Sequence, residues 1–233
     1  MNRLSPLLAV ALLTVACGVG PEPGQGGGEP VVQAHRAMGV PKDGFPSWEE
    51  RVVLVLTNRA RADPAAQSAE TCAGGCASYP PTKPLTHHHD LARAARFHAT
   101  SLKKAGSGLQ HESVCRLVSN LGAIYPGQCD GDPSCACEGG SASCSCSGGK
   151  PYCSCSGGAC TSTWGRIGLF GVQGRGENAA AGSSDPVSTF SQWVKSSGHW
   201  KIVNTSSNSQ LGVGHYGGSG KGCYSHFWVQ VYG

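Results

Sequence analysis

The order of local sequence patterns predicts an α+β fold, because helical patterns come early in the chain and strand patterns come late. Helical periods occur between residues 47 and 105 and again between residues 164 and 198. From residue 211 to residue 232, apolar residues alternate with glycine and polar residues on both sides of the glycine-rich run 217–220. Period two on both sides of such a run is typical of an antiparallel hairpin, so the chain is expected to end in one.

Two helices are predicted in the first half of the domain. The segment Ser47-Trp-Glu-Glu50 matches a capping box, in which the serine accepts from free amides of the first turn and the glutamate bonds back. Apolar residues then follow a helical period up to Asp63-Pro64, where this helix is expected to stop. A second helix opens at Thr86 or Asp90 and ends at Gly106.

Two further helices precede the hairpin. A short one is predicted over Trp164–Phe170. Asp185-Pro186 is a strong helix start, with a capping side chain followed by proline in the first turn, and this helix is expected to continue to Gly198. A third strand should join the hairpin, but the pattern does not place it.

The first residues predict export. Residues 1–16 carry an early arginine and an apolar run too short to span a bilayer, as in a secretory signal peptide. The run ends in LTVAC, which resembles a bacterial lipobox and makes Cys17 the expected lipidation site; the alternative is an ordinary signal cleaved near Ala16. Lipidation of Cys17 leaves twelve of the thirteen cysteines, an even number that disulfides can consume. Residues 17–44 then form a lipidated, Gly- and Pro-rich linker, and residues 45–233 form one domain.

The charge balance argues against a nucleic-acid partner, because the net charge is only +4 and the Lys and Arg residues are scattered. No second apolar run is long enough to cross a membrane, so membrane contact is expected only through the N-terminal lipid anchor. We expect a monomer that is anchored to the cell envelope, at the outer membrane or cell surface, or is free outside the cell.

Eight of the thirteen cysteines lie in a low-complexity insert, residues 129–160. The insert repeats a Cys-x-Cys unit three times with a period of nine residues and carries almost no large apolar side chain, so crosslinks or metal must order it. In an exported protein, disulfides are favoured over a thiolate cluster for Zn²⁺ or Cu(I), because such a cluster needs reduced cysteines. A Cys-x-Cys pair is poorly placed to bond to itself, so bonds between the copies are expected.

The cysteines outside the insert are also even in number once Cys17 is set aside. Cys72 and Cys76 can close a small loop, which leaves Cys115 for Cys223 or for a cysteine of the insert. The twelve cysteines expected in disulfides are Cys72, Cys76, Cys115, Cys129, Cys135, Cys137, Cys144, Cys146, Cys153, Cys155, Cys160 and Cys223.

Short sequence pieces occur in a fixed order between Trp48 and Gly233. They are Leu56-Thr-Asn-Arg59, Pro84-Leu-Thr, Ala92-Arg-Ala-Ala-Arg-Phe-His98-Ala, Gln110-His111, Gly165-Arg-Ile-Gly168, Gly176-Glu-Asn178, Trp193-x2-Ser-Ser-Gly-His199, Gly212-Val-Gly214 and Phe227-Trp-Val-Gln-Val231. In this order they resemble the CAP superfamily (cysteine-rich secretory, antigen and pathogenesis-related proteins, also called SCP-like), in its bacterial extracellular branch.

The resemblance implies an α-β-α sandwich, in which a small antiparallel sheet lies between helical layers. It also implies a cavity, which two histidines and two glutamates line in the wider family. Matched residue by residue, His111 takes the first histidine position and Glu177 the first glutamate position. His199 matches a histidine that bacterial relatives carry.

At two of the four cavity positions, this chain carries a different residue from the one implied by the family resemblance. The second glutamate position falls on Ser196, and the second histidine position falls on or beside Phe227, with His226 one residue away. The tryptophans are expected to be packing residues rather than a ligand cage. They are Trp164, Trp193, Trp200 and Trp228.

Two imidazoles and a carboxylate with an open position form a plausible Zn²⁺ site, so zinc on His111, Glu177 and His199 is the cofactor to expect. The same groups can perform general acid–base chemistry near neutral pH. Alternatively, Glu177 accepts backbone hydrogen bonds and pairs with one histidine, which holds the loop after the third helix. In this pocket, Asn178 is expected to bond backbone, and His98 to be a core or pocket-wall residue.

These patterns favour an exported protein that works by binding and has no catalytic residues. Its His/Glu pocket would take a divalent metal, a lipid-like small molecule or a partner protein. The alternative is a metal- or His-assisted hydrolase that acts on peptides or cell-envelope polymers. A third hypothesis makes the cysteine insert a metal or redox sensor.

Overall fold

The computed structural model of the chain describes residues 45–140, 143–145, 152–155, 158–219 and 223–233. The predicted signal peptide and linker, residues 1–44, and parts of the cysteine insert lie outside the described residues. None of the described helices is long and apolar enough to cross a membrane.

Helices and short strands are interspersed along the described chain. The helices are α2 (Trp48–Ala62), α3 (Pro64–Cys72), α4 (His89–Lys104), α5 (Leu121–Ile124), α6 (Pro133–Ala136), α7 (Thr163–Gly168), α8 (Pro186–Lys195) and α9 (Ser197–Val203). The strands are β1 (Thr86–His87), β2 (Arg116–Leu117), β3 (Cys137–Gly139), β4 (Ser143–Ser145), β5 (Tyr152–Ser154), β6 (Gly176–Ala181), β7 (Gln210–Gly217) and β8 (His226–Tyr232).

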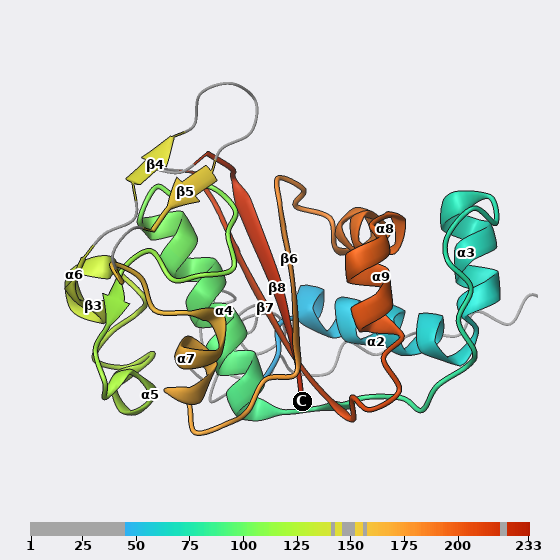
Figure 1. Cartoon of the computed structure of the whole chain (residues 1–233), viewed down its shortest axis with the longest axis horizontal. Coiled ribbons are helices and arrows are strands. Elements are labelled where there is room, and N and C mark those ends of the chain that lie inside the picture. The colour runs from blue at the N-terminus through green and yellow to red at the C-terminus, as the bar shows by residue number, and fades with distance from the viewer. Residues whose placement is uncertain (1–44, 141–142, 146–151, 156–157, 220–222) are drawn as a thin grey trace, which may run out of the picture.

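The main sheet has its strands in the order β1-β7-β8-β6. β8 pairs antiparallel with both β7 and β6, and the two-residue strand β1 adds in parallel to β7. Helix α4 packs on one face of this sheet, while α2, α8 and α9 cover the other face (Figure 1). The α+β class is therefore confirmed, and its layers form the expected sandwich. The third strand that the pattern did not place is β6.

Side-chain alternation along β8 divides the interior into two cores. Phe227, Val229 and Val231 belong to the core beneath α4, whereas Trp228 and Tyr232 belong to the core beneath α2, α8 and α9. Successive residues of a strand point to opposite faces, so an almost wholly apolar strand serves both layers. This central strand fixes which face each neighbouring strand presents to each layer.

Two glycines of β7 let α4 approach the sheet closely. A Cβ atom on Gly212 would lie 2.1 Å from the backbone nitrogen of Ala92, and one on Gly214 would lie 2.2 Å from that of Arg96. Such distances are far inside van der Waals contact, so the alternating glycines of this strand are required by the helix that crosses it. Leu211 and Val213 of the same strand face the other core.

The second predicted helix begins at neither of the two residues proposed for its start. Helix α4 begins at His89, and the His88 ring accepts from the backbone of Leu91 as its cap. Thr86 lies instead in β1, paired with Gln210 across the sheet. A two-residue strand has no periodicity of its own, and its partner lies more than a hundred residues away, so local patterns favoured a helix there.

Helices α3, α5, α6 and α9 were not predicted. Pro64 was interpreted as a helix stop, but it occupies the first turn of α3, where a missing amide costs nothing, and Asp63 caps that helix through the amide of Ala66. The predicted helix from Asp185 to Gly198 is divided, because α8 ends at Lys195 and α9 begins two residues later. Asp185 caps α8 as expected, through the amide of Ser188.

The expectation of bonds between the repeat copies stays a prediction, because the side chains of Cys144, Cys146 and Cys153 lie outside the described residues. The bonds described are Cys72–Cys76, Cys115–Cys137, Cys129–Cys135 and Cys155–Cys160, and none of them joins one copy to another. The small loop expected at residues 72–76 is confirmed. Cys115 pairs with the insert rather than with Cys223, which is also disulfide-bonded. The side chains of Cys144, Cys146 and Cys153, like Cys17, lie outside the described part of the chain.

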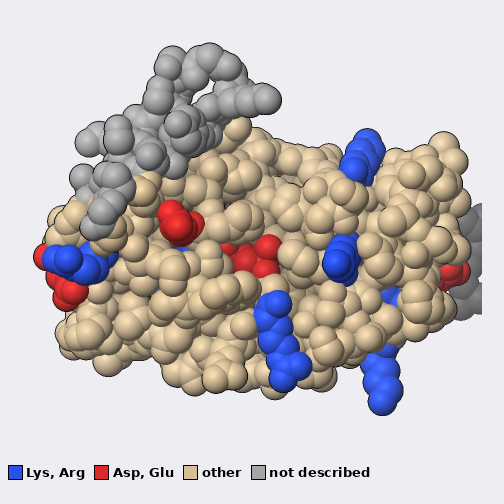
Figure 2. Space-filling view, viewed as in Figure 1, with Lys and Arg blue, Asp and Glu red and all other residues tan. Residues whose placement is uncertain are grey.

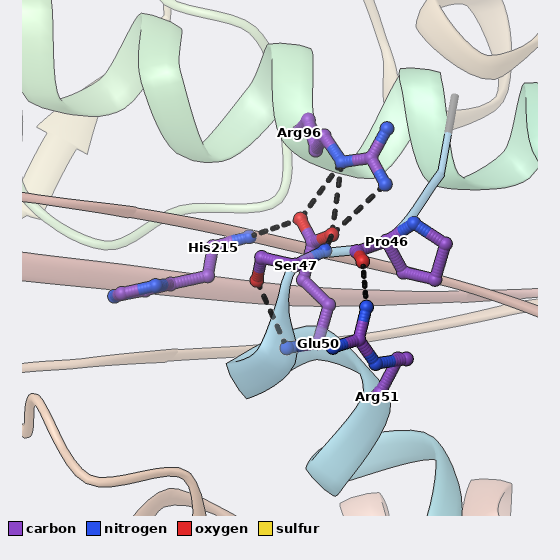
Figure 3. Close-up of polar contacts among 6 residues, drawn as sticks. All are labelled: Pro46, Ser47, Glu50, Arg51, Arg96 and His215. Carbon is purple, nitrogen blue, oxygen red and sulfur yellow. Dashed lines mark hydrogen bonds and ion pairs between the residues drawn. The ribbon is translucent and has the colours of Figure 1, made fainter. Parts of the chain in front are cut away.

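A buried carboxylate ties both helical layers to the open edge of β7. Glu50 of α2 accepts hydrogen bonds from the Ser47 amide at 2.8 Å, from the His215 amide at 3.2 Å and from the Arg96 guanidinium of α4 at 2.8–3.1 Å (Figure 3). The Ser47 hydroxyl accepts in turn from the Glu50 amide, so the predicted capping box is present. The Glu50 side chain is fully buried, and that of Arg96 is 10% exposed.

Replacing Glu50 with glutamine tests this junction. The variant keeps the shape of the side chain but leaves the buried Arg96 guanidinium without its carboxylate, so we expect a loss of about 3–5 kcal/mol in the free energy of unfolding. Urea denaturation measures it. The matched control is Glu70→Gln, which breaks the exposed pair Arg59–Glu70 and should cost no more than about 1 kcal/mol. Equal losses in the two variants would contradict a structural role for the buried pair.

Candidate functional site

The site lies where β6 and α7 meet the loop that follows α4. Glu177, the second residue of β6, has a side chain that is 2% exposed. One of its carboxylate oxygens accepts from Nδ1 of His111 at 2.9 Å, and the other accepts from Arg166 in a close ion pair. The structure therefore brings together the first histidine and the first glutamate of the predicted pocket.

Arg166 of α7 holds both members of this pair. Its guanidinium is fully buried, and while one terminal nitrogen contacts the Glu177 carboxylate, the other donates to the His111 carbonyl oxygen at 2.7 Å. The hydroxyl of Thr163 donates to the same carbonyl at 2.9 Å. The backbone and the ring of His111 are therefore positioned by one arginine, directly and through the carboxylate.

Sequence reasoning missed Arg166. The residue was quoted as part of the piece Gly165-Arg-Ile-Gly168 but was given no role. A signal was available, because an arginine in a short apolar helix must either reach water or find an acceptor inside. Its acceptor, Glu177, lies eleven residues further along on another element, so the pair is visible only in the fold.

The charges around the pair shift the titration of its neighbours. Burial raises the pKa of the Glu177 carboxyl, but the Arg166 charge and the hydrogen bond from His111 outweigh it and bring this pKa down to about 2. Burial, followed by the Arg166 charge, lowers the pKa of His98 from 6.5 to about 3. Near neutral pH, Glu177 is thus ionised and unable to donate a proton, and His98 is uncharged.

His98 is a fully buried core histidine. From the sequence, it was expected either in the core or in the pocket wall. Its Nε2 lies 2.8 Å from the carbonyl oxygen of Gln110, which can only accept, so Nε2 carries the proton. Among the described residues, its Nδ1, the Arg166 Nε and the Gln110 Nε2 are buried without a hydrogen-bond partner. Buried polar atoms of this kind are normally satisfied by ordered water.

The His111 ring is the accessible group of the site, with a side chain that is 52% exposed. A carboxylate can only accept, so Nδ1 of His111 carries the proton in this hydrogen bond. Its Nε2 has no hydrogen-bond partner among the described residues and offers a lone pair when the ring is neutral. Glu177 thereby fixes both the tautomer and the orientation of this imidazole.

His199 lies near this pair but is not bonded to it. Burial, and then the charge of His111, lower the pKa of the His199 ring, which places the two imidazoles within electrostatic reach of each other. Within the described residues, no hydrogen bond or ion pair joins the His199 ring to Glu177. Asn178 donates to the His199 carbonyl oxygen at 3.4 Å and to the Gln230 side chain at 3.1 Å, so it does bond backbone as expected.

A small cavity of about 290 Å³ opens beside His111. Trp164, which was expected to be a packing residue, is 53% exposed at the start of α7. The other three tryptophans of that expectation are fully buried. The cavity is lined by His111, Thr163, Trp164, Arg175, Gly176, Glu177 and Ile202.

Neither of the two residues that replace the family's second glutamate and second histidine lines this cavity. Phe227 is buried in the core beneath α4, and Ser196 lies at the junction of α8 and α9. His226 does not approach His111, because it starts β8 one residue before Phe227 and hydrogen-bonds His215 of β7 instead.

The contacts of Glu177 bear on the zinc site predicted at His111, Glu177 and His199. Both Glu177 oxygens already accept hydrogen bonds, and the Arg166 cation beside them opposes a second cation. The arrangement suits His111 as a ligand through Nε2, with Glu177 orienting the ring from behind. In the described part of the chain, no three His, Cys, Asp or Glu side chains are grouped to hold a metal, so zinc stays a prediction.

Charged side chains are sparse on the face of the molecule that Figure 2 shows. Figure 2 shows most Lys and Arg side chains of this face standing apart from one another among uncharged residues. The absence of a nucleic-acid partner, expected from the sequence, stays a prediction.

The pKa of His98 predicts how stability depends on pH. The unfolded histidine takes up a proton near pH 6.5, whereas the folded one does so only near pH 3, so stability should fall as pH falls between these values. The slope contributed is at most about 1.4 kcal/mol per pH unit. Urea denaturation from pH 7 to 4.5 should show a shallower fall in His98→Gln than in the wild type.

The matched control for this test is His89→Gln at the exposed start of α4, which should keep the wild-type slope. His215, whose pKa is lowered to about 4, acts in the same direction and remains in both variants. An unchanged slope in His98→Gln would contradict the assignment.

Comparison with known proteins gives one match. The sequence model described as CAP, the cysteine-rich secretory protein family, matches residues 136–232, which contain Glu177 and His199 but not His111. No curated protein and no solved structure matches the chain.

Proposed function

We propose that this chain is an exported binding module of the cysteine-rich secretory protein family, in its bacterial branch. The family match from residue 136 to residue 232 supports this, as do the pieces that precede it in family order, from Leu56-Thr-Asn-Arg59 to Gln110-His111. The α-β-α layering over residues 45–233 is that expected of the family. The match and the layering together support this assignment for the whole domain.

Export is supported by the cysteines. The described part of the chain holds several disulfides, which persist in oxidising compartments and are typical of extracellular proteins. We propose that residues 1–16 are removed as a signal peptide and that Cys17 is lipidated, which anchors the domain to the cell envelope through the linker 17–44.

The observation that carries the binding function is the pinned imidazole of His111. It is half exposed beside a cavity of about 290 Å³, with Glu177 and Arg166 fixing its ring and backbone. The exposed Trp164 ring and the Arg175 guanidinium line the same cavity. A lone pair, an aromatic face and a cation around one recess form a recognition surface for a small polar molecule.

The size of the cavity favours some ligands over others. It lies at the lower end of the range for small-molecule pockets, which is roughly 300–1,000 Å³. We therefore favour a small polar ligand, or a metal ion held through His111 and His199, over a lipid-like molecule with a long chain. A partner protein could contact the cavity with a single side chain.

A hydrolase is the second candidate, and the same histidine is the observation that favours it. A carboxylate-oriented imidazole with a free Nε2 can act as a general base. In the described residues, however, no hydroxyl or thiol is hydrogen-bonded to the His111 ring, so an activated nucleophile would have to be a water molecule. For this reason binding is placed first.

Native mass spectrometry of the protein purified from its own compartment tests the proposal. We expect a bound small molecule or metal to add mass to the wild type and to be lost from His111→Ala, because the free Nε2 is removed. The matched control is His89→Ala, an exposed histidine of α4 outside the cavity. Retention of the bound mass by His111→Ala would contradict the site.

A hydrolase would give a different result in the same experiment. Peptide or cell-wall fragments would be cleaved by the wild type and left intact by His111→Ala. Such turnover would overturn the binding function in favour of the second candidate.

The lipid anchor has its own test. The variant Cys17→Ala cannot be acylated, so the protein should move from the membrane fraction to the soluble fraction of the producing cell. Fractionation followed by immunoblotting measures the shift, and intact mass measures the acyl chains. A wild-type protein already wholly soluble, without added acyl mass, would contradict the anchor and support an ordinary signal cleaved near Ala16.

A further inference from the structure

Two histidines outside the described site meet across the terminal hairpin. Nε2 of His215, on β7, lies 3.0 Å from Nδ1 of His226, on β8, and their rings are nearly parallel, at 8°. Both side chains are partly exposed. One ring nitrogen must donate and the other accept, so the pair shares one proton between two nitrogens that face each other.

The hairpin holds both rings in place. The His215 ring stacks on the Trp228 indole, with ring centroids 3.8 Å apart, and its amide is bound to Glu50. In Figure 3 the His215 ring points away from the Glu50 carboxylate. A Cβ atom on Gly217 would lie 2.0 Å from Nδ1 of His226, so the missing side chain at this position is what gives the His226 ring its room.

The electrostatic surroundings keep both rings neutral near pH 7. Burial, and then the charge of His226, lower the pKa of His215 to about 4, while Glu49 acts in the opposite direction. Burial, followed by the charge of Lys103, lowers the pKa of His226. Neutral imidazole is the form that ligates metals, so no proton has to be displaced into solvent at neutral pH.

We propose that His215 and His226 form a surface site for a divalent transition metal ion, with Cu(II) bound most tightly. The donating ring moves its proton to its other nitrogen, which frees both facing nitrogens as ligands. The His226 ring also turns, so that both lone pairs meet at one ion beside the line that joins the nitrogens. Cu(II) heads the affinity order of such ions for nitrogen ligands and prefers tetragonal geometry.

The spacing of the nitrogens is compatible with this geometry. Two nitrogens about 2.0–2.1 Å from a metal lie about 2.9 Å apart at a right angle and about 3.3 Å apart at a tetrahedral angle. The observed 3.0 Å lies between these two values. His215 also lines a cavity of about 600 Å³ that leaves space for water molecules on the remaining positions.

This site is separate from the pocket at His111. His215 stacks on Trp228, which belongs to the core beneath α2, α8 and α9, whereas His111 contacts Glu177 and Arg166 beside α7. The proposal does not rest on the proposed function.

A copper titration tests the proposed site at His215 and His226. The exported, disulfide-bonded protein is titrated with one equivalent of Cu(II), and binding is followed by electron paramagnetic resonance and calorimetry. We expect one bound ion with a tetragonal signal and two histidine nitrogens. His226→Gln should weaken binding at least tenfold. Gly217→Ala should do the same without altering either ligand, because it displaces the His226 ring.

A control separates this site from another histidine of the chain. His87→Gln, in the exposed strand β1, should bind Cu(II) at this site as the wild type does. Wild-type affinity in His226→Gln, or loss of the signal in His87→Gln, would overturn the proposal. Far-UV circular dichroism of each variant excludes misfolding as the cause, and both His226 and Gly217 are accessible enough for substitution to be tolerated.

Discussion

The buried carboxylate of Glu50 is the contact on which the sandwich depends. Strand β1 protects β7 only at Gln210 and Leu211, and beyond that point the strand edge would be open. Glu50 occupies this edge by accepting from the His215 amide, and Arg96 reaches it from the opposite helical layer. The hydrogen bonds from these donors compensate the burial of the carboxylate charge. By occupying the β7 edge, the carboxylate also blocks pairing of this strand with another chain.

A buried carboxylate–arginine pair lies on each side of the sheet. At the β7 edge, Glu50 pairs with Arg96, and at the β6 edge, Glu177 pairs with the fully buried Arg166. The difference lies in what else each carboxylate holds. Glu50 binds backbone amides and serves the fold, whereas Glu177 also binds the accessible ring of His111. The candidate site is therefore a structural ion pair to which one half-exposed imidazole has been added.

Features that depend on neighbouring residues were predictable from the sequence. The capping box at Ser47 and the capped, proline-led start of α8 at Asp185 are local hydrogen-bond patterns, and both are present. The hairpin of β7 and β8 followed from period two. The family resemblance supplied the layering and led to His111 and Glu177, which the fold does bring together.

Features that depend on distant partners were not predictable. Glu50 was recognised as a cap, but Arg96, its partner 46 residues away, is chosen by the packing of α4 on the sheet. The contact of Arg166 with Glu177 and the disulfide from Cys115 to Cys137 also join residues that only the fold brings together. Pro64 shows the other kind of failure, since proline ends one helix and begins the next, and the residues alone did not say which.

The base of the cysteine insert has a consequence for how this protein can vary. Cys115 is crosslinked to Cys137, and Cys155 to Cys160, while the backbone of Thr161 bonds Ser113 and Cys115 at 2.9 Å. Both stems of the excursion are thus clamped to the segment that directly follows His111. Because the described contacts that position the imidazole come from Glu177, Arg166 and Thr163, we expect changes in chain length beyond these clamps to leave it in place.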